Sequence, residues 1–213
     1  HLIHGITGSG KTEVYMELID FCIKQGKTAI VLIPEIALTY QTVMRFTRRF
    51  KEKVSIINSR LSKGERYDQF ERAKNGDVSI MIGPRSALFT PFLNLGLIII
   101  DEEHEGAYKS ESVPKYHATE VAIKRAKDTG ATLVLGSATP SIESYYRAKN
   151  GIYKLHKLTK REKGQLPAVH VVDLREELKN DNKSIFSLKL QELIKDRLEK
   201  KQQIMLFINR RGY

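Results

Sequence analysis

The sequence is short of several features that would define other classes of protein. It has no tryptophan and one cysteine, Cys22, so neither an internal disulfide nor a cysteine-cluster zinc site can form within the chain. No apolar run approaches the roughly 18–20 residues of a membrane-spanning helix. No signal peptide is visible. These absences predict a cytoplasmic globular protein without a membrane segment, and we expect a monomer.

The composition is that of a protein with a substantial core and a basic surface. The chain has 213 residues, of which 41% are hydrophobic, enough for one large domain or for one domain and part of another. The formal net charge is +11, and residues 151–213 alone carry 15 basic and 8 acidic residues. Such an excess suits a polyanionic partner such as nucleic acid, although a solvated lysine-rich surface has the same composition.

Residues 5–12 form a glycine-rich loop directly before a helical pattern. They read Gly-Ile-Thr-Gly-Ser-Gly-Lys-Thr, which fits the phosphate-binding pattern G-x-x-x-x-G-K-[ST]. The glycines bring backbone N–H groups close to a phosphate chain, and the helix N-terminus adds positive potential. We expect Gly8, Ser9 and Gly10 to form the cradle. Lys11 would reach the β and γ phosphates, and the Thr12 hydroxyl would bind Mg²⁺.

Apolar runs alternate with helical patterns, which favours an α/β fold with a mostly parallel central sheet. Strands are predicted at 28–33, 54–57, 78–82, 97–100 and 132–135, and helices at 12–24, 37–50, 62–74, 118–127 and 140–149. Cys22 falls on the apolar side of the first helix, where we expect a buried small hydrophobe.

The pattern changes after Gly151. We expect a linker over 157–167, strands at 168–173 and 204–208, a loop over 176–183 and a helix at 187–201. The chain therefore divides into a domain over 1–150, a linker with the first strand of a second domain over 151–183, and a truncated continuation of that domain over 184–213. Because both ends fall next to predicted strands, we interpret the chain as a piece of a longer protein.

Four predicted strands end in residues that carry chemistry. These ends are the loop at 5–12, Pro34-Glu35, Asp101-Glu102 and residues 137–139. In open α/β sheets, ligands bind at the carboxyl ends of the strands, so these groups should meet at one edge. We assign Asp101 to the Mg²⁺ shell and Glu102 to orienting and deprotonating an attacking water. His104 is expected to link this strand end to the next by hydrogen bonds.

Three motifs in this order resemble motifs I, II and III of the superfamily 2 helicases. They are Gly-Ser-Gly-Lys-Thr at 8–12, Asp-Glu-Glu-His at 101–104 and Gly-Ser-Ala-Thr-Pro at 136–140. Residues 5–15, 34–39, 83–87 and 209–213 further resemble a bacterial, replication-restart branch of that superfamily. The resemblance covers essentially the whole chain. It implies a RecA-like P-loop NTPase fold with the start of a second RecA-like lobe, and ATP and Mg²⁺ as cofactors.

The resemblance also implies roles for other residues. Ser137 and Thr139 match the motif that couples the nucleotide state to the grip on DNA and to lobe closure. Residues 35–39, which include Thr39, and the pair Arg85-Ser86 match segments that contact a DNA strand. Residues 106–117 lie where the family has an aromatic-rich loop that senses single-stranded DNA. We therefore expect Tyr108, Lys109 and Tyr116 of this loop to contact DNA. The alternative is an ordinary polar surface loop.

The activity implied is ATP-driven 3′-to-5′ translocation and unwinding of DNA at stalled replication forks, near the nucleoid. The implied partners are single-stranded and forked DNA, single-strand-binding protein and the primosome proteins. In the family a cysteine-rich zinc module follows the segment matched by 209–213, so zinc is expected only beyond this chain. The arginine finger lies there too, and we expect the chain alone to have little ATPase activity.

Three other interpretations stay open. One is a different superfamily 2 DNA translocase, acting in recombination or repair. Another is a P-loop kinase of a small molecule, although no lid or acceptor pocket is suggested by the basic tail. The third is a nucleic-acid-binding module without catalysis, against which the intact Lys11, Asp101 and Glu102 argue.

Overall fold

The computed structural model describes residues 1–161 and 167–208. The chain forms two compact units, His1–Gly164 and Gln165–Tyr213, and each is described by itself. The first unit is built on a seven-stranded sheet with the strand order β3-β4-β2-β5-β6-β1-β7. Every neighbouring pair is parallel. This confirms the α/β class and the parallel sheet, and the arrangement is that of a RecA-like domain.

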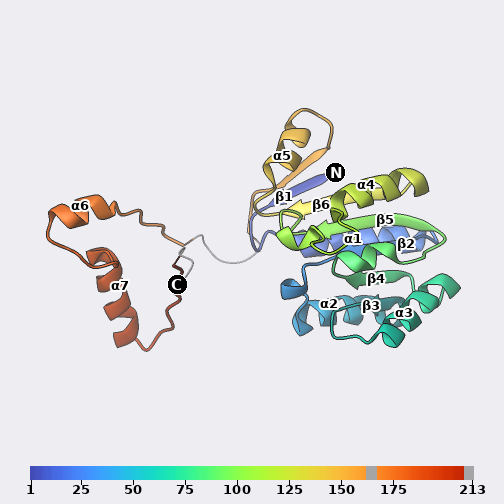
Figure 1. The fold of residues 1–213 in the computed structure, drawn as a ribbon, viewed down its shortest axis with the longest axis horizontal. Helices are drawn as coiled ribbons and strands as arrows, with labels where there is room; N and C mark the ends of the chain where they lie inside the picture. The colour runs from blue at the N-terminus through green and yellow to red at the C-terminus, as the bar shows by residue number, and fades with distance from the viewer. Residues whose placement is uncertain (162–166, 209–213) are drawn as a thin grey trace. The chain divides into compact units, whose positions relative to one another are not determined.

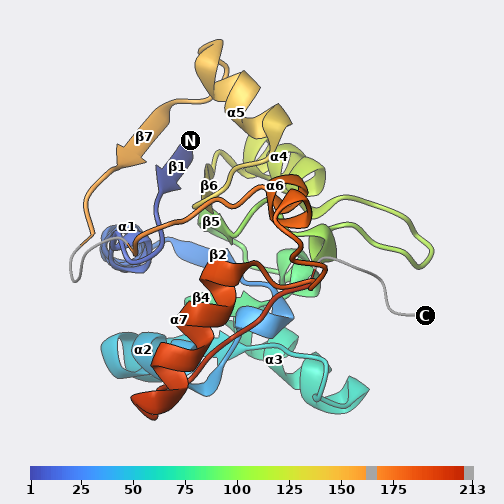
Figure 2. The same cartoon turned by 90° about the vertical axis from the view of Figure 1, so that its left-hand side faces the viewer.

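The sheet and its helices follow the predicted order. The strands are β1 (Leu2–Gly5), β2 (Thr28–Leu32), β3 (Val54–Ile56), β4 (Ile80–Gly83), β5 (Leu95–Asp101), β6 (Thr132–Ser137) and β7 (Leu155–Leu158). The helices are α1 (Lys11–Lys24), α2 (Tyr40–Phe50), α3 (Lys63–Asn75), α4 (Ala118–Thr129) and α5 (Ile142–Lys149). In Figure 2 the strand labels run from β7 to β4, with α1 and α2 on one side of the sheet and α3 and α4 on the other.

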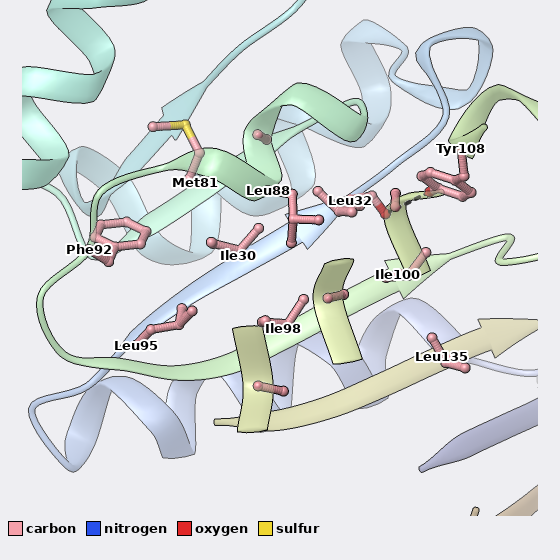
Figure 3. Close-up of a cluster of buried hydrophobic side chains, with 14 of the residues drawn as sticks. Ile30, Leu32, Met81, Leu88, Phe92, Leu95, Ile98, Ile100, Tyr108 and Leu135 are labelled. Atoms are coloured by element: carbon pink, nitrogen blue, oxygen red, sulfur yellow. Dashed lines mark hydrogen bonds between the residues drawn. The ribbon is translucent and has the colours of Figure 1, made fainter. Parts of the chain in front are cut away.

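Two apolar layers cover the two faces of the sheet. Side chains alternate along a strand, so in β5 Ile98 and Ile100 face one layer while Leu97 and Ile99 face the other. The first layer, which includes Phe92 and Tyr108, is drawn in Figure 3. Because central strands are covered on both faces, they read as continuous apolar runs rather than as alternating ones. Cys22 is buried in the second layer, as predicted.

Helix ends follow the local chemistry of the sequence. Ser62 caps α3 by accepting a hydrogen bond from the Glu65 N–H, and the Glu65 carboxylate accepts one from the Ser62 N–H, which completes a capping box. Gly76 ends α3 in the left-handed region. Helix α5 differs from the prediction, because Ser141 is its cap and Pro140 lies outside it. A serine hydroxyl there satisfies a helix N–H that proline has no group to satisfy.

Strand β7 was not predicted. Lys157 and Leu158, which we placed in a linker, pair with His4 and Gly5 of β1. The stretch is polar because β7 is an edge strand and only partly buried. Its pairing leaves the P-loop strand β1 as an interior strand of the sheet.

The second unit contains two helices among its described residues, α6 (Leu174–Lys179) and α7 (Leu188–Glu199) (Figure 1). Ser187 caps α7 as predicted. We expected Asp173 to end a strand and a loop to follow over 176–183. Asp173 is instead the N-cap of helix α6. Residues 168–173 and 204–208 are not strands. Their apolar side chains are largely exposed, with Val171 at 94% and Met205 at 95%. A strand needs a partner for its backbone groups, and neither segment is paired here.

Among the described residues, no helix is long and apolar enough to cross a bilayer.

The buried face of β5 yields a stability prediction. Ile98 is fully buried in the centre of the sheet, so Ile98→Ala should lower the free energy of unfolding by about 2–5 kcal/mol. Leu93 is 90% exposed just before the same strand, and Leu93→Ala should change it by less than about 0.5 kcal/mol. Urea unfolding followed by circular dichroism measures both, and equal losses would contradict the assigned core.

Candidate nucleotide-binding site

The glycine-rich loop joins the end of β1 to the start of α1. Gly8 and Gly10 have φ angles of 79° and 85°, in the left-handed region that favours glycine. Gly10 is the N-cap of α1, and because glycine has no side chain it supplies no oxygen to accept a hydrogen bond from the helix N–H groups. The first N–H groups of α1 therefore have no partner within the helix. This is the backbone arrangement that binds a phosphate group at a helix N-terminus.

The interior of the loop is crowded and polar. The Lys11 ammonium donates a hydrogen bond to the carbonyl oxygen of Gly5 at 2.9 Å, so the lysine is folded back over the loop. A Cβ atom on Gly5 would lie 2.5 Å from the Ser9 hydroxyl oxygen, so position 5 has no room for a side chain. The Ser9 hydroxyl is buried and has no hydrogen-bond partner among the described residues. An unsatisfied buried hydroxyl costs free energy, and phosphate oxygens are groups that could satisfy it.

One cavity gathers the predicted nucleotide residues. Its lining consists of Thr7, Gly8, Ser9, Gly10, Lys11, Thr12, Glu13, Arg45, Asp101 and Glu102. The loop and the acidic pair, which are about ninety residues apart in the sequence, thus share one pocket. Arg45 and Glu13 were not singled out from the sequence. They form an ion pair across α1 and α2 at the rim of this cavity.

Asp101 is mostly buried at the end of β5. Its carboxylate accepts a hydrogen bond from the Tyr15 hydroxyl at 2.9 Å. Burial raises the pKa of Asp101 above its usual value, and the negative charge of Glu102 adds to the rise, while Tyr15 and Lys11 act in the opposite direction. A desolvated carboxylate beside phosphate-binding groups is suited to a divalent cation. ATP with Mg²⁺ therefore fits the residues present.

Glu102 and His104 connect this strand end to the next. Glu102 has a φ angle of 46°, a strained backbone for a residue with a side chain. The turn is held by the Glu105 N–H donating to the Glu102 carbonyl at 2.9 Å. The His104 ring lies 2.7 Å from the Ser137 hydroxyl through Nδ1 and 3.4 Å from the Thr139 hydroxyl through Nε2.

The three residues predicted to couple the site, His104, Ser137 and Thr139, are thus in direct contact. Ser137 also accepts a hydrogen bond from the Thr139 N–H at 2.9 Å. The Glu102 carboxylate lies 3.7 Å from His104 Nδ1. A continuous polar path therefore runs from the nucleotide cavity to the segment after β6.

Glu103 has a structural role that the sequence analysis missed. Its side chain is 4% exposed. The carboxylate accepts hydrogen bonds from the Ser141 N–H at 2.7 Å, the Ser141 hydroxyl at 3.2 Å and the Ser144 hydroxyl at 3.0 Å. It thereby fixes the N-terminus of α5 to the end of β5, and a buried carboxylate needs several donors of this kind.

A second cavity lies over the carboxyl ends of β2 and β4. It is lined by Pro34, Glu35, Asn58, Ser59, Arg66, Pro84, Arg85, Ser86, Ala107 and Tyr108. Arg85 and Ser86, predicted to contact DNA, both belong to it. The Arg85 guanidinium donates to the carbonyl oxygens of Ala107 and Lys109, each at 2.9 Å, so it also holds the turn between them.

The predicted DNA-contacting side chains are in very different environments. Lys109 is exposed. Tyr116 is half-buried and packs edge-on against Phe89, with 5.4 Å between the ring centroids. The hydroxyl of Thr39 is used to cap α2.

Tyr108 corrects the expectation that it stacks on a base. It is 1% exposed, so neither face of its ring is available for stacking. Its hydroxyl donates to the carbonyl oxygens of Leu32 at 3.1 Å and Asp101 at 2.6 Å. Figure 3 shows Tyr108 beside Leu32 at the end of β2. The large apolar ring is more favourably placed in the core than in solvent, and two carbonyl oxygens at strand ends satisfy its hydroxyl.

The most informative residue that sequence reasoning missed is Tyr15. It lies one helical turn after Lys11, on the inner side of α1, and is 1% exposed. Its position one turn beyond the phosphate-binding lysine was the available signal, but the partner Asp101 is far away in the sequence.

The strand order, the phosphate-binding loop and the acidic strand end define a P-loop nucleotide-binding protein. A model of the DEAD/DEAH box helicase family matches residues 1–148. The chain belongs to this family.

Curated relatives match the chain over its whole length. The replication restart protein PriA of Bacillus subtilis is 52% identical over 213 residues, covering 100% of this chain and 26% of the relative. PriA of Chlamydia pneumoniae is 49% identical, covering 100% of this chain and 29% of the relative. The chain thus spans between about a quarter and a third of the length of these relatives.

Solved structures support the fold. The helicase domain of Pyrococcus furiosus Hef superposes with a TM-score of 0.51 at 21% identity, covering 74% of this chain and 34% of that one. The structure of RecG bound to a three-way DNA junction gives a TM-score of 0.52 at 24% identity, covering 75% and 20%. At these identities the likeness concerns the fold alone.

The raised pKa of Asp101 leads to a prediction about stability. When folding raises the pKa of an acid, the folded protein binds more protons, so stability falls as the pH rises through the folded pKa. At neutral pH the ionised Asp101 therefore opposes folding. We expect Asp101→Asn to raise the free energy of unfolding of the ligand-free protein at pH 7.5 by up to about 2 kcal/mol.

Thermal and urea unfolding at pH 7.5 and at pH 4 measure this effect. The gain should shrink at the lower pH, because Asp101 is then closer to neutral. Asp68 is an exposed aspartate on α3, and Asp68→Asn is the matched control without such a gain. A loss of stability in Asp101→Asn at pH 7.5 would contradict the sign of the effect.

Proposed function

We propose that the chain is the nucleotide-binding part of an ATP-dependent DNA helicase that acts at stalled replication forks. The observation that carries the proposal is the single cavity in which Lys11, Asp101 and Glu102 meet, connected through His104 to the segment after β6. Nucleotide binding alone needs the loop. The acidic pair and the histidine link are what a motor adds to it.

The chemistry follows from the residues around this cavity. The loop N–H groups and Lys11 hold the phosphates, while Thr12 and Asp101 would hold Mg²⁺. When bound there, Mg²⁺ would supply positive charge for the phosphoryl oxygens of the transition state. Glu102, next to Asp101, orients the attacking water and takes its proton. Because His104 lies 3.7 Å from Glu102 and contacts Ser137, a change at the phosphates alters the segment after β6.

The DNA partner is proposed from charge, geometry and relatives. The cavity with Arg85 and Ser86 lies at the same sheet edge as the nucleotide cavity. Lys109 is exposed next to it, because its carbonyl oxygen accepts a hydrogen bond from Arg85. The relatives carry the name replication restart protein, which supports forked and single-stranded DNA as substrates. We extend this to 3′-to-5′ translocation, to single-strand-binding and primosome proteins as partners, and to a monomer working at the bacterial nucleoid.

The two compact units support a proposal for the domains. We assign the first unit to the ATP-binding lobe and the second to the start of the other RecA-like lobe. The apolar segments 168–173 and 204–208 would become strands when the remaining strands of that lobe pair with them. Little ATPase activity is expected without the arginine finger of that lobe.

A different DNA translocase, acting in recombination or repair, is the nearest alternative. The RecG and Hef structures share the fold, and the fold does not separate these activities. A small-molecule kinase is less well supported, because the lining of the second cavity includes Arg66 and Arg85, which suit a polyanionic partner.

Lys11 gives the direct test of nucleotide binding. Lys11→Ala should weaken the binding of ATP by at least tenfold, because it removes the ammonium group that reaches the phosphates. Lys24, at the other end of α1, is exposed and paired with Asp20, and Lys24→Ala should bind like the wild type. Fluorescence titration with a labelled ATP analogue measures both. Unchanged affinity in Lys11→Ala would end the P-loop interpretation.

Lys109 gives a test of DNA binding. Lys109→Ala should weaken the binding of single-stranded DNA and reduce the slope of log affinity against log salt by about one, as expected when one phosphate contact is lost. Lys124 is an exposed lysine on α4 that is paired with Asp128, so Lys124→Ala should leave both quantities unchanged. Fluorescence anisotropy at several salt concentrations reports them. Absence of DNA binding by the wild type at low salt would count against a helicase.

A further inference from the structure

Two buried tyrosines hold Asp101 at two different points. Tyr15 and Tyr108 are each 1% exposed, and each donates its hydroxyl hydrogen to Asp101. Tyr15 reaches the carboxylate oxygen Oδ1 from α1, while Tyr108 reaches the main-chain carbonyl oxygen from the turn after β5. The two residues are alike in burial and chemistry but differ in which part of the aspartate they hold.

The Tyr15 hydroxyl occupies a space that the neighbouring strand leaves open for it. A Cβ atom on Gly136 would lie 1.7 Å from the hydroxyl oxygen, so only glycine at this position lets Tyr15 reach the end of β5. Gly136 is paired directly with Asp101 in the sheet.

Tyr108 acts on the backbone instead. Besides Asp101 it donates to the Leu32 carbonyl, so it joins the last residues of β2 and β5. Arg85 holds the turn on both sides of Tyr108 through the carbonyls of Ala107 and Lys109. These contacts fix where the strand ends, but they leave the rotation of the Asp101 side chain free.

We propose that Tyr15 is a positioning residue that orients the Asp101 carboxylate toward Mg²⁺. The proposal rests on the proposed function, since it assumes that Asp101 is a ligand of the ion. The bond to Oδ1 restricts the rotation of the side chain, and Asp101 lines the nucleotide cavity. Groups that hydrogen-bond a metal-ligating carboxylate contribute to metal affinity although they do not touch the metal.

The test compares Tyr15→Phe with Tyr108→Phe in the full 213-residue chain. Each variant removes one buried hydroxyl, and the two should lose a similar amount of stability. A labelled ATP analogue is titrated at increasing Mg²⁺ concentration and, separately, in EDTA. For Tyr15→Phe we expect the Mg²⁺ concentration at half-saturation to rise about tenfold, with the affinity in EDTA unchanged. For Tyr108→Phe we expect a change of less than about twofold in both.

Gly136→Ala is a second variant that displaces the Tyr15 hydroxyl rather than removing it. It should raise the half-saturating Mg²⁺ concentration in the same direction as Tyr15→Phe. The proposal is overturned if Tyr15→Phe leaves the Mg²⁺ dependence unchanged, or if Tyr108→Phe shifts it equally. A wild-type protein that binds the nucleotide with no effect of Mg²⁺ would instead refute the metal site of the proposed function, and this inference with it.

Discussion

Parallel pairing of three strands places every group of the nucleotide site. Gly136 of β6 is paired with Asp101 of β5 on one side and with Ile3 of β1 on the other. This register brings the start of the phosphate loop, the acidic strand end and Ser137 to one level of the sheet. A slip of one residue would turn each side chain to the opposite face, and both apolar layers resist such a slip. The core and the site are therefore held by the same set of backbone hydrogen bonds.

The site keeps several arrangements that oppose stability. Asp101 is a desolvated carboxylate, Glu102 has a strained backbone, and the Ser9 hydroxyl has no partner among the described residues. Each of these would be relieved by a ligand that brings phosphate oxygens and a cation. Glu103, which is next to the strained residue, is by contrast fully satisfied by three donors. Glu102 thus lines the nucleotide cavity, whereas its neighbour Glu103 holds the N-terminus of α5 in place.

Local patterns predicted much of the first unit. Apolar runs identified β2, β5 and β6 because these strands are buried on both faces, and the helical pattern over 62–74 agrees with α3 to within one residue at each end. Most residues of the nucleotide cavity were also predictable, because the loop and the acidic pair are each contiguous, whereas Glu13 and Arg45 were not. What the sequence left open depends on contacts between distant segments. Tyr15 meets Asp101 across 86 residues, and no local pattern marks that pair.

For Tyr108 and the second unit, local patterns predicted environments that the structure does not have. An aromatic residue among lysines is typical of a nucleic-acid contact, yet two strand-end carbonyls made the core the better place for its hydroxyl. The apolar runs at 168–173 and 204–208 have the composition of strands, but composition alone does not supply a partner for their backbone groups. Strand β7 was missed because it is short and polar, as edge strands often are.

The segment between β6 and α5 is anchored at both of its ends. His104 contacts the Ser137 hydroxyl at one end, and Glu103 binds the N–H of Ser141 at the other. Both anchors come from the same turn after β5, so the two attachment points keep a constant separation. Only residues 138–140 lie between the two anchors, and Thr139 is itself held by Ser137 and His104. We therefore expect a change that reaches this loop from the nucleotide cavity to alter residues 138–140 before it moves α5.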